Sequence, residues 1–355
     1  MDRTQRLADP ELLDPEHEEV HLARGTRTGV PLAIAIHSTR SGPAIGGCRI
    51  RGYSTWHEGL ADVLRLSRAM TLKCALAELP HGGGKAVAMV PDRPLAPGTR
   101  PALIRDIADR IAQLDGRYLT GPDLGSGPED MAVIHDHAQG WAFCRPESRG
   151  GSGDSSPGTA RGVVVALTAA LAHTHGRGLS GLRVGVVGFG RVGRLVASSL
   201  AAADAQVIVS DVDDGLRPEA ERRGLAWAST ELLHEELDVL VPAATGGLLT
   251  AATARSCRAT LVVGPANNQL ADEGVEAVLR ERGIVWIPDV IASAGGIIHA
   301  VCREELDLDE VATNARIDAI GDKVSRILEV ARDQGTTTSQ AARAVAAETD
   351  QAVSR

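Results

Sequence analysis

Aromatic residues and surplus positive charge are both scarce in this sequence, and each shortage limits what the protein can be. Aromatic residues form 2% of the 355 residues, so the core must consist of Ala, Val, Leu and Ile, as is common in α/β enzymes with buried parallel sheets. The formal net charge of −9 leaves no basic excess to neutralise phosphate groups. We therefore expect no nucleic acid among its partners.

Paired cysteines, a signal peptide and long apolar runs are missing as well. The five cysteines are odd in number and lack CxxC spacing, which is typical of reduced thiols and not of a disulfide or zinc framework. No run of eighteen apolar residues occurs, and the acidic N-terminus has no apolar core of the signal type. We therefore expect a soluble, cytoplasmic protein without a membrane partner.

The length and one flexible stretch predict more than one domain. A chain of 355 residues exceeds one ordinary core, and residues 148–158 are rich in Gly and Ser, as is typical of a linker. Residues 18–39 predict a hairpin, and a long helix begins at Thr55. After the linker, five strand–helix units predict a parallel, doubly wound α/β sheet with helices on both faces. We expect domains over residues 1–150 and 151–305, then a C-terminal helical segment over 306–355.

Residues 184–193, VGVVGFGRVG, form the clearest ligand motif. Gly188, Gly190 and Gly193 have GxGxxG spacing between a predicted strand and a predicted helix, where glycine allows a tight turn and close approach to a pyrophosphate. The next strand ends at Asp211, whose carboxylate can accept from both ribose hydroxyls and would repel a 2′-phosphate. A glycine-rich turn without a ligand is the alternative, but the whole pattern favours NAD as the cofactor.

The segment 70–87, MTLKCALAELPHGGGKAV, carries two lysines around a break in the helical pattern. Lys73 lies late in the helix, and Lys85 follows a proline and three glycines that we expect to turn the chain. A phosphate-binding P-loop is excluded, because it needs Gly and then Ser or Thr where this chain has Leu79 and Ala86. In an apolar neighbourhood burial disfavours the ammonium form, so Lys85 is suited to act as a base near neutral pH.

Several short motifs, in a shared order, give the sequence a resemblance to a known family. They lie at residues 43–49 (PAIGGCR), 70–73 (MTLK), 82–85 (GGGK), 120–123 (TGPD), 156–160 (SPGTA), 266–270 (ANNQL) and 288–296 (PDVIASAGG). In these motifs the chain resembles the glutamate, leucine, valine and phenylalanine dehydrogenases, which oxidatively deaminate L-amino acids with NAD(P), and most of all the leucine/valine/phenylalanine branch. The resemblance implies an N-terminal α/β substrate and oligomerisation domain, a C-terminal Rossmann domain, a cleft between them, and a homo-oligomer. The C-terminal helical segment could pack back on the first domain, which we favour, or serve a subunit contact.

The resemblance implies a chemical role for three residues. Lys73 matches the lysine that binds the substrate α-carboxylate, and Lys85 matches the catalytic lysine that activates water. Asp123 matches the aspartate that moves protons to and from the amino group. Taken singly, Lys73 could be a solvated cation at a helix end, and Asp123 could be an Asx-turn residue.

Four further positions match residues that line the substrate or the cofactor. Gly46 and Gly47 correspond to backbone in the substrate pocket. Thr159 and Asn267 correspond to positions beside the nicotinamide and the substrate. The implied reaction takes a hydride from Cα, hydrolyses the imine and leaves a 2-oxo acid and ammonia.

The residues that match the side-chain pocket favour an apolar substrate. Glutamate enzymes carry a lysine at the position of Ile45, which cannot pair a charge, so a buried γ-carboxylate would lose its hydration without compensation. Gly121 opens space for a ring, as in the phenylalanine-type enzymes, whereas Ile297 narrows the opposite wall and Ala300 opens it again. Aromatic and branched-chain amino acids both remain candidates, because one methylene changes the free energy by only about 1–3 kcal/mol.

One departure from the family pattern motivates two alternatives. The family usually has Asn where this chain has Ser293, and serine offers one donor where asparagine offers two. The chain could be a catalytically weakened NAD-binding homologue that acts as a sensor or assembly component. It could also be a secondary-metabolism enzyme of unusual specificity. A hydroxy-acid dehydrogenase is a third reading, disfavoured because the chain has lysines and no catalytic His–carboxylate pair.

Two pairs of histidines resemble incomplete metal-ligand sets. His135 and His137 lie in one predicted helix, and His173 and His175 lie in another, where side chains two residues apart diverge by about 200°. We expect solvated histidines and no metal site. His81, beside the three glycines, is left open between a pocket residue and a surface residue.

Overall fold

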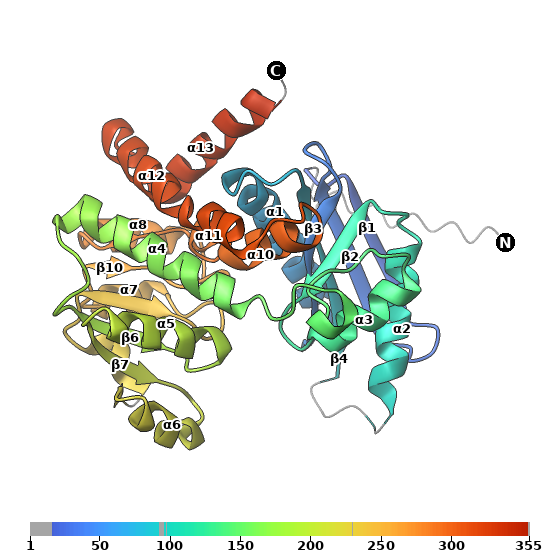
Figure 1. Cartoon of the computed structure of the whole chain (residues 1–355), viewed down its shortest axis with the longest axis horizontal. Coiled ribbons are helices and arrows are strands. Elements are labelled where there is room, and N and C mark those ends of the chain that lie inside the picture. The colour runs from blue at the N-terminus through green and yellow to red at the C-terminus, as the bar shows by residue number, and fades with distance from the viewer. Residues whose placement is uncertain (1–15, 92–95, 97, 229, 354–355) are drawn as a thin grey trace. The chain divides into compact units, whose positions relative to one another are not determined.

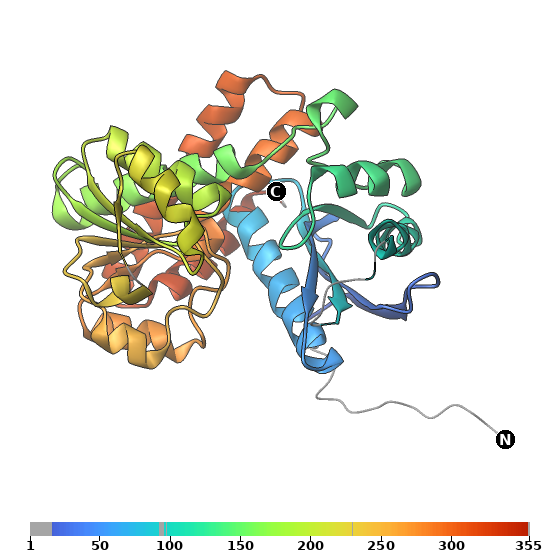
Figure 2. The same ribbon diagram turned by 90° about the horizontal axis from the view of Figure 1, so that it is seen from below.

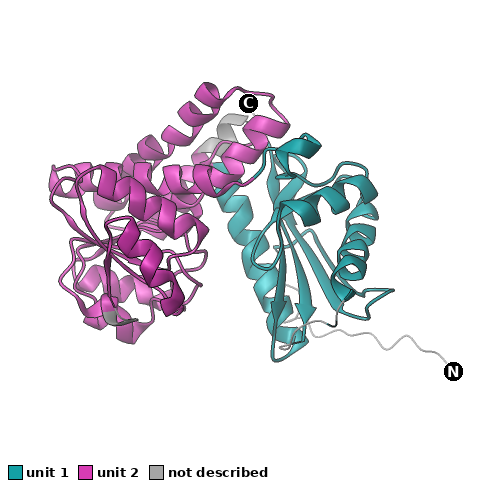
Figure 3. Cartoon of the chain, turned by 60° about the horizontal axis from the view of Figure 1, so that its bottom comes forward, with its two compact units in different colours: residues 1–75, 80–153 teal, residues 76–79, 154–355 magenta. Residues whose placement is uncertain are grey.

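The computed structural model describes residues 16–91, 96, 98–228 and 230–353. The chain divides into two compact units (Figure 3). Unit 1 comprises residues 1–75 and 80–153, and unit 2 comprises residues 76–79 and 154–355. The main boundary therefore falls inside the predicted Gly/Ser-rich linker, while the three predicted segments stay predictions. Residues 1–15, where the sequence predicts no signal peptide, lie outside the described residues.

Unit 1 is built on one five-stranded sheet (Figure 1). The strand order is β1-β2-β4-β3-β5, in which β1–β2 and β2–β4 are antiparallel pairs and β4–β3 and β3–β5 are parallel pairs. The predicted hairpin is the β1–β2 pair. The elements are β1 (Glu19–Arg24), β2 (Pro31–Ser38), β3 (Ala44–Gly52), α1 (Trp56–Leu76), β4 (Gly82–Val90), α2 (Thr99–Ala112), β5 (Tyr118–Pro122), α3 (Pro128–His137) and the 3-10 helix Glu147–Arg149.

Helix α1 covers one face of this sheet, and α2 and α3 cover the other (Figure 2). Strand residues alternate between the faces. On β4, Val87 packs with α1, whereas Ala86 and Ala88 pack with the core under α2 and α3. The same alternation directs Arg49 and Lys85 to the α1 face. The charged side chains of the two strands therefore lie on the same face of the sheet.

The glycines before Lys85 do not form the turn that the sequence predicts. Residues Gly82–Gly84 begin strand β4, and the chain turns earlier, at Glu78, which has a φ of 53°. Glycine is needed in this strand because neighbouring groups approach closely. A Cβ on Gly83 would lie 2.1 Å from the Thr71 nitrogen, and one on Gly84 would lie 2.7 Å from the Tyr118 ring.

Unit 2 is built on a six-stranded parallel sheet with the order β11-β10-β9-β6-β7-β8 (Figure 1). The strand order reverses between β6 and β9, and such a switch point is where doubly wound sheets bind ligands. The elements are α4 (Ser156–His175), β6 (Arg183–Val187), α5 (Arg191–Ala202), β7 (Gln206–Ser210), the 3-10 helix Asp214–Leu216, α6 (Arg217–Arg222), β8 (Ala226–Trp227), the 3-10 helix Thr230–His234, β9 (Val239–Pro242), α7 (Ala251–Ser256), β10 (Leu261–Val262), α8 (Gly274–Glu281), β11 (Val285–Trp286), α9 (Asp289–Ala292), α10 (Gly295–Glu304), α11 (Glu310–Asp318), α12 (Ile320–Gln334) and α13 (Thr338–Val353).

Helices cover both faces of the unit 2 sheet, as predicted. Helices α7 and α8 share a core with β9 and β10 on one face, and α4 and α5 pack on the other. Helices α10 and α12 lie along α4 within the same unit, and α13 packs against α12. Across the described residues, no helix combines the length and apolar character needed to cross a membrane.

Candidate active site

Lys85 and Asp123 form a buried ion pair on the α1 face of the unit 1 sheet. The Nζ of Lys85 on β4 lies 2.9 Å from Oδ2 of Asp123, which follows the end of β5, and the two side chains are 6% and 13% exposed. Burial alone would raise the pKa of Asp123, but the charges of Lys85 and Arg49 outweigh it and hold that pKa well below its usual range. The structure therefore brings the predicted base and the predicted proton carrier into direct contact.

Backbone of β3 lies against this pair, at the two glycines that the sequence singles out. A Cβ on Gly47 would stand 2.9 Å from the Lys85 Nζ and 2.7 Å from the Asp123 Cβ, so a side chain there would displace the pair. The Tyr118 hydroxyl donates to the carbonyl oxygens of Gly46 (3.0 Å) and Gly47 (3.2 Å). Tyr118 is fully buried and fixes this backbone, a role that the sequence does not reveal.

Two neighbours of Asp123 are also absent from the sequence-based prediction. Arg49 donates from Nε to Asp123 Oδ2 over 2.9 Å. The Ser126 hydroxyl accepts from the Asp123 backbone nitrogen over 2.9 Å and donates to the Cys48 carbonyl over 2.7 Å. The surroundings of Lys85 are therefore ionic, and the prediction of a mainly apolar neighbourhood is wrong. The arginine in PAIGGCR belongs to a motif that the sequence shows, but its burial and its carboxylate partner are visible only in the structure.

The other predicted residues of unit 1 occupy buried positions. Lys73 lies on α1 and is 8% exposed, so it is not a solvated cation at a helix end. Ile45 on β3 is fully buried. Lysine is rare in this chain: the whole sequence holds only three, at 73, 85 and 323, among 37 Lys and Arg residues, and two of the three are therefore predicted site residues. His81 is buried, and its Nδ1 pairs with the Pro43 carbonyl at 3.1 Å, which removes the surface reading for that residue.

Gly121 does not open a space, because the chain fills it. A Cβ on Gly121 would lie 2.6 Å from Cε2 of Phe143, and this ring is 6% exposed. The interpretation of Gly121 as room for a substrate ring is therefore wrong at this position. Phe143, which no sequence motif singles out, takes up the volume instead.

The glycine motif of unit 2 lies at the switch point of the sheet and fits a pyrophosphate. It follows β6 and leads into α5, whose N-cap residue is Gly190. Gly188 has a φ of 107°, and a Cβ there would lie 2.5 Å from the Ala244 nitrogen. Apart from Gly190 and its neighbours in the chain, no atom of the described residues lies within 4 Å of the Cβ position of Gly190, so the loop is open at this point. Backbone N–H groups at such a helix start suit an anion.

Asp211 is oriented by the same loop. Its Oδ2 accepts from the Phe189 backbone nitrogen over 2.7 Å, and its Oδ1 accepts from the Asp213 nitrogen over 3.1 Å. Each carboxylate oxygen keeps a further lone pair, so Asp211 can still accept from a ribose hydroxyl. Gly188, Gly190, Gly193 and Asp211 are thus brought together at one end of β6 and β7.

Three predicted residues lie on α4 and α10, two helices that pack closely against each other within unit 2. A Cβ on Gly296 would stand 2.4 Å from Oγ1 of Thr159, so this hydroxyl lies at the start of α10. On α10, Ile297 is half-buried and Ala300 is 1% exposed. The Ser293 hydroxyl donates to the Asp289 carbonyl over 2.6 Å, which commits its single donor to the chain itself.

Asn267 lies in the segment between β10 and α8, next to a residue with left-handed backbone. Asn268 has a φ of 54°, and its backbone nitrogen donates to Oδ2 of the buried Asp289 over 2.9 Å. Asn267 itself is half-buried. The Asp289 contact thereby fixes the backbone beside Asn267.

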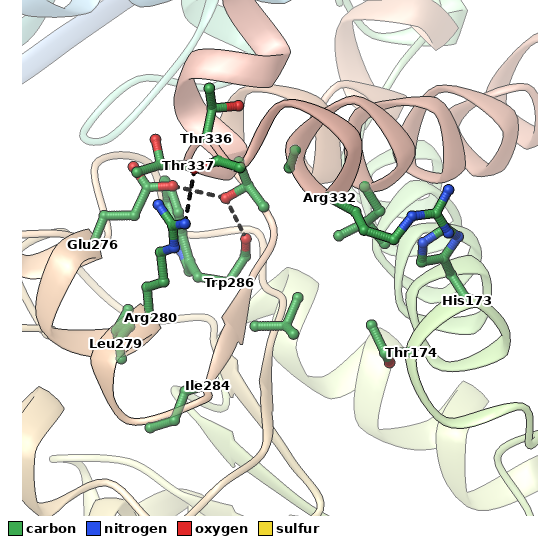
Figure 4. Close-up of a pocket in the computed structure, with 15 residues that line it drawn as sticks. His173, Thr174, Glu276, Leu279, Arg280, Ile284, Trp286, Arg332, Thr336 and Thr337 are labelled. Carbon is green, nitrogen blue, oxygen red and sulfur yellow. Dashed lines mark hydrogen bonds between the residues drawn. The ribbon is translucent and has the colours of Figure 1, made fainter.

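A cavity of about 430 Å³ in unit 2 is lined by His173 but by none of the predicted catalytic, substrate or cofactor residues (Figure 4). It lies among α4, α8, β11 and α12, and two of its charged side chains bind other parts of the protein. Glu276 accepts from the Thr338 hydroxyl (2.8 Å), and Arg280 donates to the Gly335 carbonyl (2.8 Å). Because none of the predicted site residues line it, we do not assign the active site to this cavity. Among the residues described, no group of His, Cys, Asp or Glu could hold a metal ion.

A parallel sheet with a glycine loop at its switch point, in one chain with a buried lysine–aspartate pair, defines a two-domain dehydrogenase. The chain belongs to the glutamate/leucine/phenylalanine/valine dehydrogenase family. Residues 17–140 match the dimerisation domain of Glu/Leu/Phe/Val dehydrogenases, and residues 217–349 match the Glutamate/Leucine/Phenylalanine/Valine dehydrogenase domain. The predicted resemblance, and the predicted enzyme class of oxidoreductases acting on a CH–NH2 group, are thereby confirmed.

Individual relatives cover nearly the whole chain. It is 38% identical to the valine dehydrogenase of Streptomyces virginiae over 340 residues, covering 93% of this chain and 92% of the relative. It is 36% identical to the phenylalanine dehydrogenase of Thermoactinomyces intermedius over 333 residues, covering 92% and 89%. The crystal structure of L-tryptophan dehydrogenase from Nostoc punctiforme superposes with a TM-score of 0.77 at 30% identity, covering 98% of each chain.

A third family match bears on the cofactor. Residues 161–260 match the NAD binding domain of D-isomer specific 2-hydroxyacid dehydrogenases. This match confirms the prediction of NAD. It does not extend to Lys85 or Asp123, so it gives no support to the hydroxy-acid reading.

Proposed function

We propose that this chain catalyses the NAD-dependent oxidative deamination of an apolar L-amino acid. The amino acid, NAD⁺ and water are converted into the 2-oxo acid, ammonium, NADH and a proton. The observation that carries the proposal is the 2.9 Å contact between Lys85 Nζ and Asp123 Oδ2 on a buried sheet face. A lysine and a carboxylate in contact can pass protons between a substrate amine, water and each other.

The residues of unit 1 supply the acid–base chemistry in this proposal. Lys73 holds the α-carboxylate of the substrate. Asp123 accepts a proton from the substrate ammonium group, so that the free amine can be oxidised. Lys85 takes a proton from the water that attacks the imine carbon, and Asp123 returns a proton to the departing nitrogen. Gly47 leaves room for the substrate beside the pair, because any side chain there would collide with Lys85.

The residues of unit 2 hold the dinucleotide in this proposal. Gly188, Gly190 and Gly193 receive the pyrophosphate at the start of α5, and Asp211 accepts from the ribose hydroxyls. When bound, NAD supplies the acceptor for the hydride that leaves Cα. Thr159 and Asn267 orient the nicotinamide and the substrate.

The preference for an apolar side chain is supported by Ile45. This residue is fully buried where the glutamate enzymes carry a charged lysine, so the chain offers no cation there for a γ-carboxylate. Relatives named valine, phenylalanine and tryptophan dehydrogenase at 35–38% identity support the same class. Since Phe143 fills the space beside Gly121, aromatic and branched-chain substrates stay equal candidates.

The proposal is tested by following absorbance at 340 nm with a panel of L-amino acids at alkaline pH. We expect NADH formation with apolar amino acids, none with L-glutamate, and an ammonia-dependent reverse reaction with the matching 2-oxo acid. Ser293, whose hydroxyl is bound to Asp289, keeps the sensor reading as the second candidate. NADH binding without turnover on any amino acid would favour that reading and overturn the proposal.

We also infer that the chain forms a homo-oligomer in the cytoplasm. The match of residues 17–140 to the family's dimerisation domain supports an assembly through unit 1. All five cysteines are buried free thiols, which supports a reducing compartment. Light scattering coupled to gel filtration tests the assembly, and a monomer at micromolar concentration would contradict it.

A further inference from the structure

Arg49 and Asp62 extend the Lys85–Asp123 pair into a chain of buried charges within unit 1. Arg49 donates from Nε to Asp123 Oδ2 and from Nη1 to Asp62 Oδ2, each over 2.9 Å. The Arg49 and Asp62 side chains are only 9% and 8% exposed. The guanidinium therefore bridges two carboxylates, and its planar fork fixes the direction from which it reaches Asp123.

Helix α1 and the chain before it hold Asp62 in place. The Tyr53 hydroxyl donates to Asp62 Oδ2 over 2.6 Å, and Arg65 donates from Nη2 to Oδ1 over 2.7 Å. Burial would raise the pKa of Asp62, but the Tyr53 hydrogen bond and the Arg49 charge outweigh it, and the pKa is lowered. Asp62 therefore stays ionised and anchors Arg49 from the side opposite to Asp123.

The buried charges balance. Lys85 and Arg49 are the cations, and Asp123 and Asp62 are the anions. Arg65, the outermost group, has a side chain that is 53% exposed, so water screens its charge. Because the nitrogens of Lys85 and Arg49 share one oxygen, they lie within about 6 Å of each other, close enough for each charge to act on the other.

We propose that Arg49, anchored by Asp62, is a positioning residue that holds the Asp123 carboxylate beside Lys85 and keeps it ionised while Lys85 gives up its proton. An arginine does not lose its own proton, so Asp123 retains a cationic partner throughout a cycle in which the lysine becomes neutral. The part played by Lys85 rests on the function proposed above. The arrangement of the four charges does not.

Other titratable groups near the cluster leave its charge unchanged near neutral pH. Burial raises the pKa of the Cys48 thiol on β3 to about 12, and burial raises the pKa of Tyr118 on β5 well above its usual range. Asp130 on α3 also acts on Cys48, and its carboxylate is paired with Arg100 of α2 at 2.6 Å. Cys48 and Tyr118 therefore do not set the response of the cluster to pH, and the buried Lys73 of α1 is present unchanged in every variant below.

If the four charges act on one another, removing a cation and removing an anion should change proton binding in opposite directions. A network with a purely structural role predicts no such difference. Without the Arg49 charge the buried cluster becomes net negative and binds protons more readily. Without the Asp62 charge it becomes net positive and releases them more readily. Two variants that both remove one hydrogen-bonded partner should thus shift proton binding in opposite directions.

The scarcity of lysine allows a direct measurement without substrate. With ¹³Cε-labelled lysine, three side-chain signals are expected, and a Lys85→Met variant assigns the one of interest. We expect Arg49→Gln to raise the titration midpoint of the Lys85 signal by about one pH unit or more, and Asp62→Asn to lower it. Arg65→Gln is the matched control, because it also removes one positive charge that is hydrogen-bonded to Asp62, but at an exposed site. It should shift the Lys85 midpoint by less than half as much as Arg49→Gln does.

Kinetics provide the second readout. The acid limb of the pH–rate profile should move to higher pH in Arg49→Gln and to lower pH in Asp62→Asn. Arg49→Lys, which keeps the charge but cannot span both carboxylates, should leave the limb near its original pH while kcat falls.

Shifts of the same sign in Arg49→Gln and Asp62→Asn, or an equal shift in Arg65→Gln, would overturn the proposal. If Arg49→Gln does not fold, Arg49→Lys and Asp62→Asn decide it, and an unmoved midpoint in Asp62→Asn contradicts it. A wild-type chain without turnover would refute the proposed function, while the NMR titration still decides the role of Arg49.

Discussion

The Cα of Gly193 packs so closely against the carbonyl of Gly188 that a Cβ at position 193 would stand 2.0 Å from the carbonyl oxygen. Gly190, in the same motif, differs. Apart from its neighbours in the chain, no atom of the described residues lies within 4 Å of its Cβ position, and its φ of −71° and ψ of −164° suit any residue. Packing within the chain therefore requires glycine at position 193. At position 190 it does not, and we attribute that glycine to the pyrophosphate that we expect to bind there.

We expect the two glycines to fail in different ways when replaced by alanine. Gly193→Ala should destabilise the chain by about 1–3 kcal/mol, because the methyl group collides with backbone that cannot yield. Gly190→Ala should leave the unfolding midpoint unchanged and weaken NADH binding at least about tenfold, by placing a methyl group in the path of the pyrophosphate. Urea unfolding and NADH fluorescence measure the two effects. Unchanged NADH affinity in Gly190→Ala would contradict the assignment.

Lys85→Ala should reduce turnover by about a thousandfold or more while NADH still binds, because the variant lacks the base that activates water. Lys323→Ala is the matched control. Lys323 lies on α12 of unit 2 and pairs with the half-exposed Glu78 at 2.6 Å, so its loss should change the rate by less than twofold. Steady-state rates and NADH titrations separate binding from chemistry. Near-normal deamination by Lys85→Ala would remove this residue from the mechanism.

The carboxylate of Asp211 should set the preference for NADH over NADPH. Asp211→Asn should weaken NADH binding by about tenfold and reduce the discrimination against NADPH, because it removes both a charged acceptor and the repulsion of the 2′-phosphate. Asp214→Asn, an equal change of charge on the nearby exposed 3-10 helix, should have a much smaller effect. Fluorescence titration with both dinucleotides gives the ratio. Tighter binding of NADPH by the wild type would refute the role of Asp211.

Gly121 should act through Phe143 and not directly on a substrate. A Cβ at this position lies 2.6 Å from the ring, so Gly121→Ala should cost about 1–3 kcal/mol of stability. Phe143→Leu in the same chain should recover part of that loss, which a double-mutant cycle of unfolding free energies would show as coupling. An altered substrate preference in Gly121→Ala without any loss of stability would instead mean that the space belongs to the substrate.

Asp106 should make the stability of unit 1 depend on acid pH. This buried carboxylate accepts from the Thr28 hydroxyl (2.7 Å), from the Arg27 nitrogen (3.0 Å) and from the Thr28 nitrogen (2.9 Å). Burial would raise its pKa, but these hydrogen bonds lower the pKa to about 2. Since the folded state has the lower pKa, the stabilisation is present above about pH 4 and is lost as the pH falls towards 2.

The Asp106→Asn variant tests this dependence. Its deficit in unfolding free energy relative to the wild type should shrink by about 1–2 kcal/mol between pH 5 and pH 2. Asp115→Asn is the control, because Asp115 is exposed in left-handed backbone that asparagine tolerates well. A deficit that does not change with pH would show that Asp106 is not ionised in the folded chain.

The sequence predicts most of the fold because its periodic patterns are local. The strand–helix alternation after residue 154 and the capping signal at Thr55 both correspond to observed elements. The glycines at 82–84 mislead for a physical reason. Glycine favours turns, but it also permits close packing between a strand and its neighbours, and a local pattern does not distinguish the two cases.

The site is only half visible in the sequence. Lys85 and Asp123 stand out through their motifs, and the register of β3, β4 and β5 brings them together. Asp62 and Phe143 do not stand out, because their importance comes from contacts with residues that are distant in the sequence. Sequence spacing carries no information on which buried carboxylate an arginine will meet.

The near absence of lysine has a practical consequence for chemical labelling. Two of the three lysines are 8% and 5% exposed, and Lys323 has a side chain that is 23% exposed. Among the lysines, acylating reagents should therefore modify little beyond Lys323 in the folded protein. A mass increase at Lys73 or Lys85 would then show that these buried lysines of unit 1 have become exposed. The two side chains can therefore serve as built-in reporters of local unfolding.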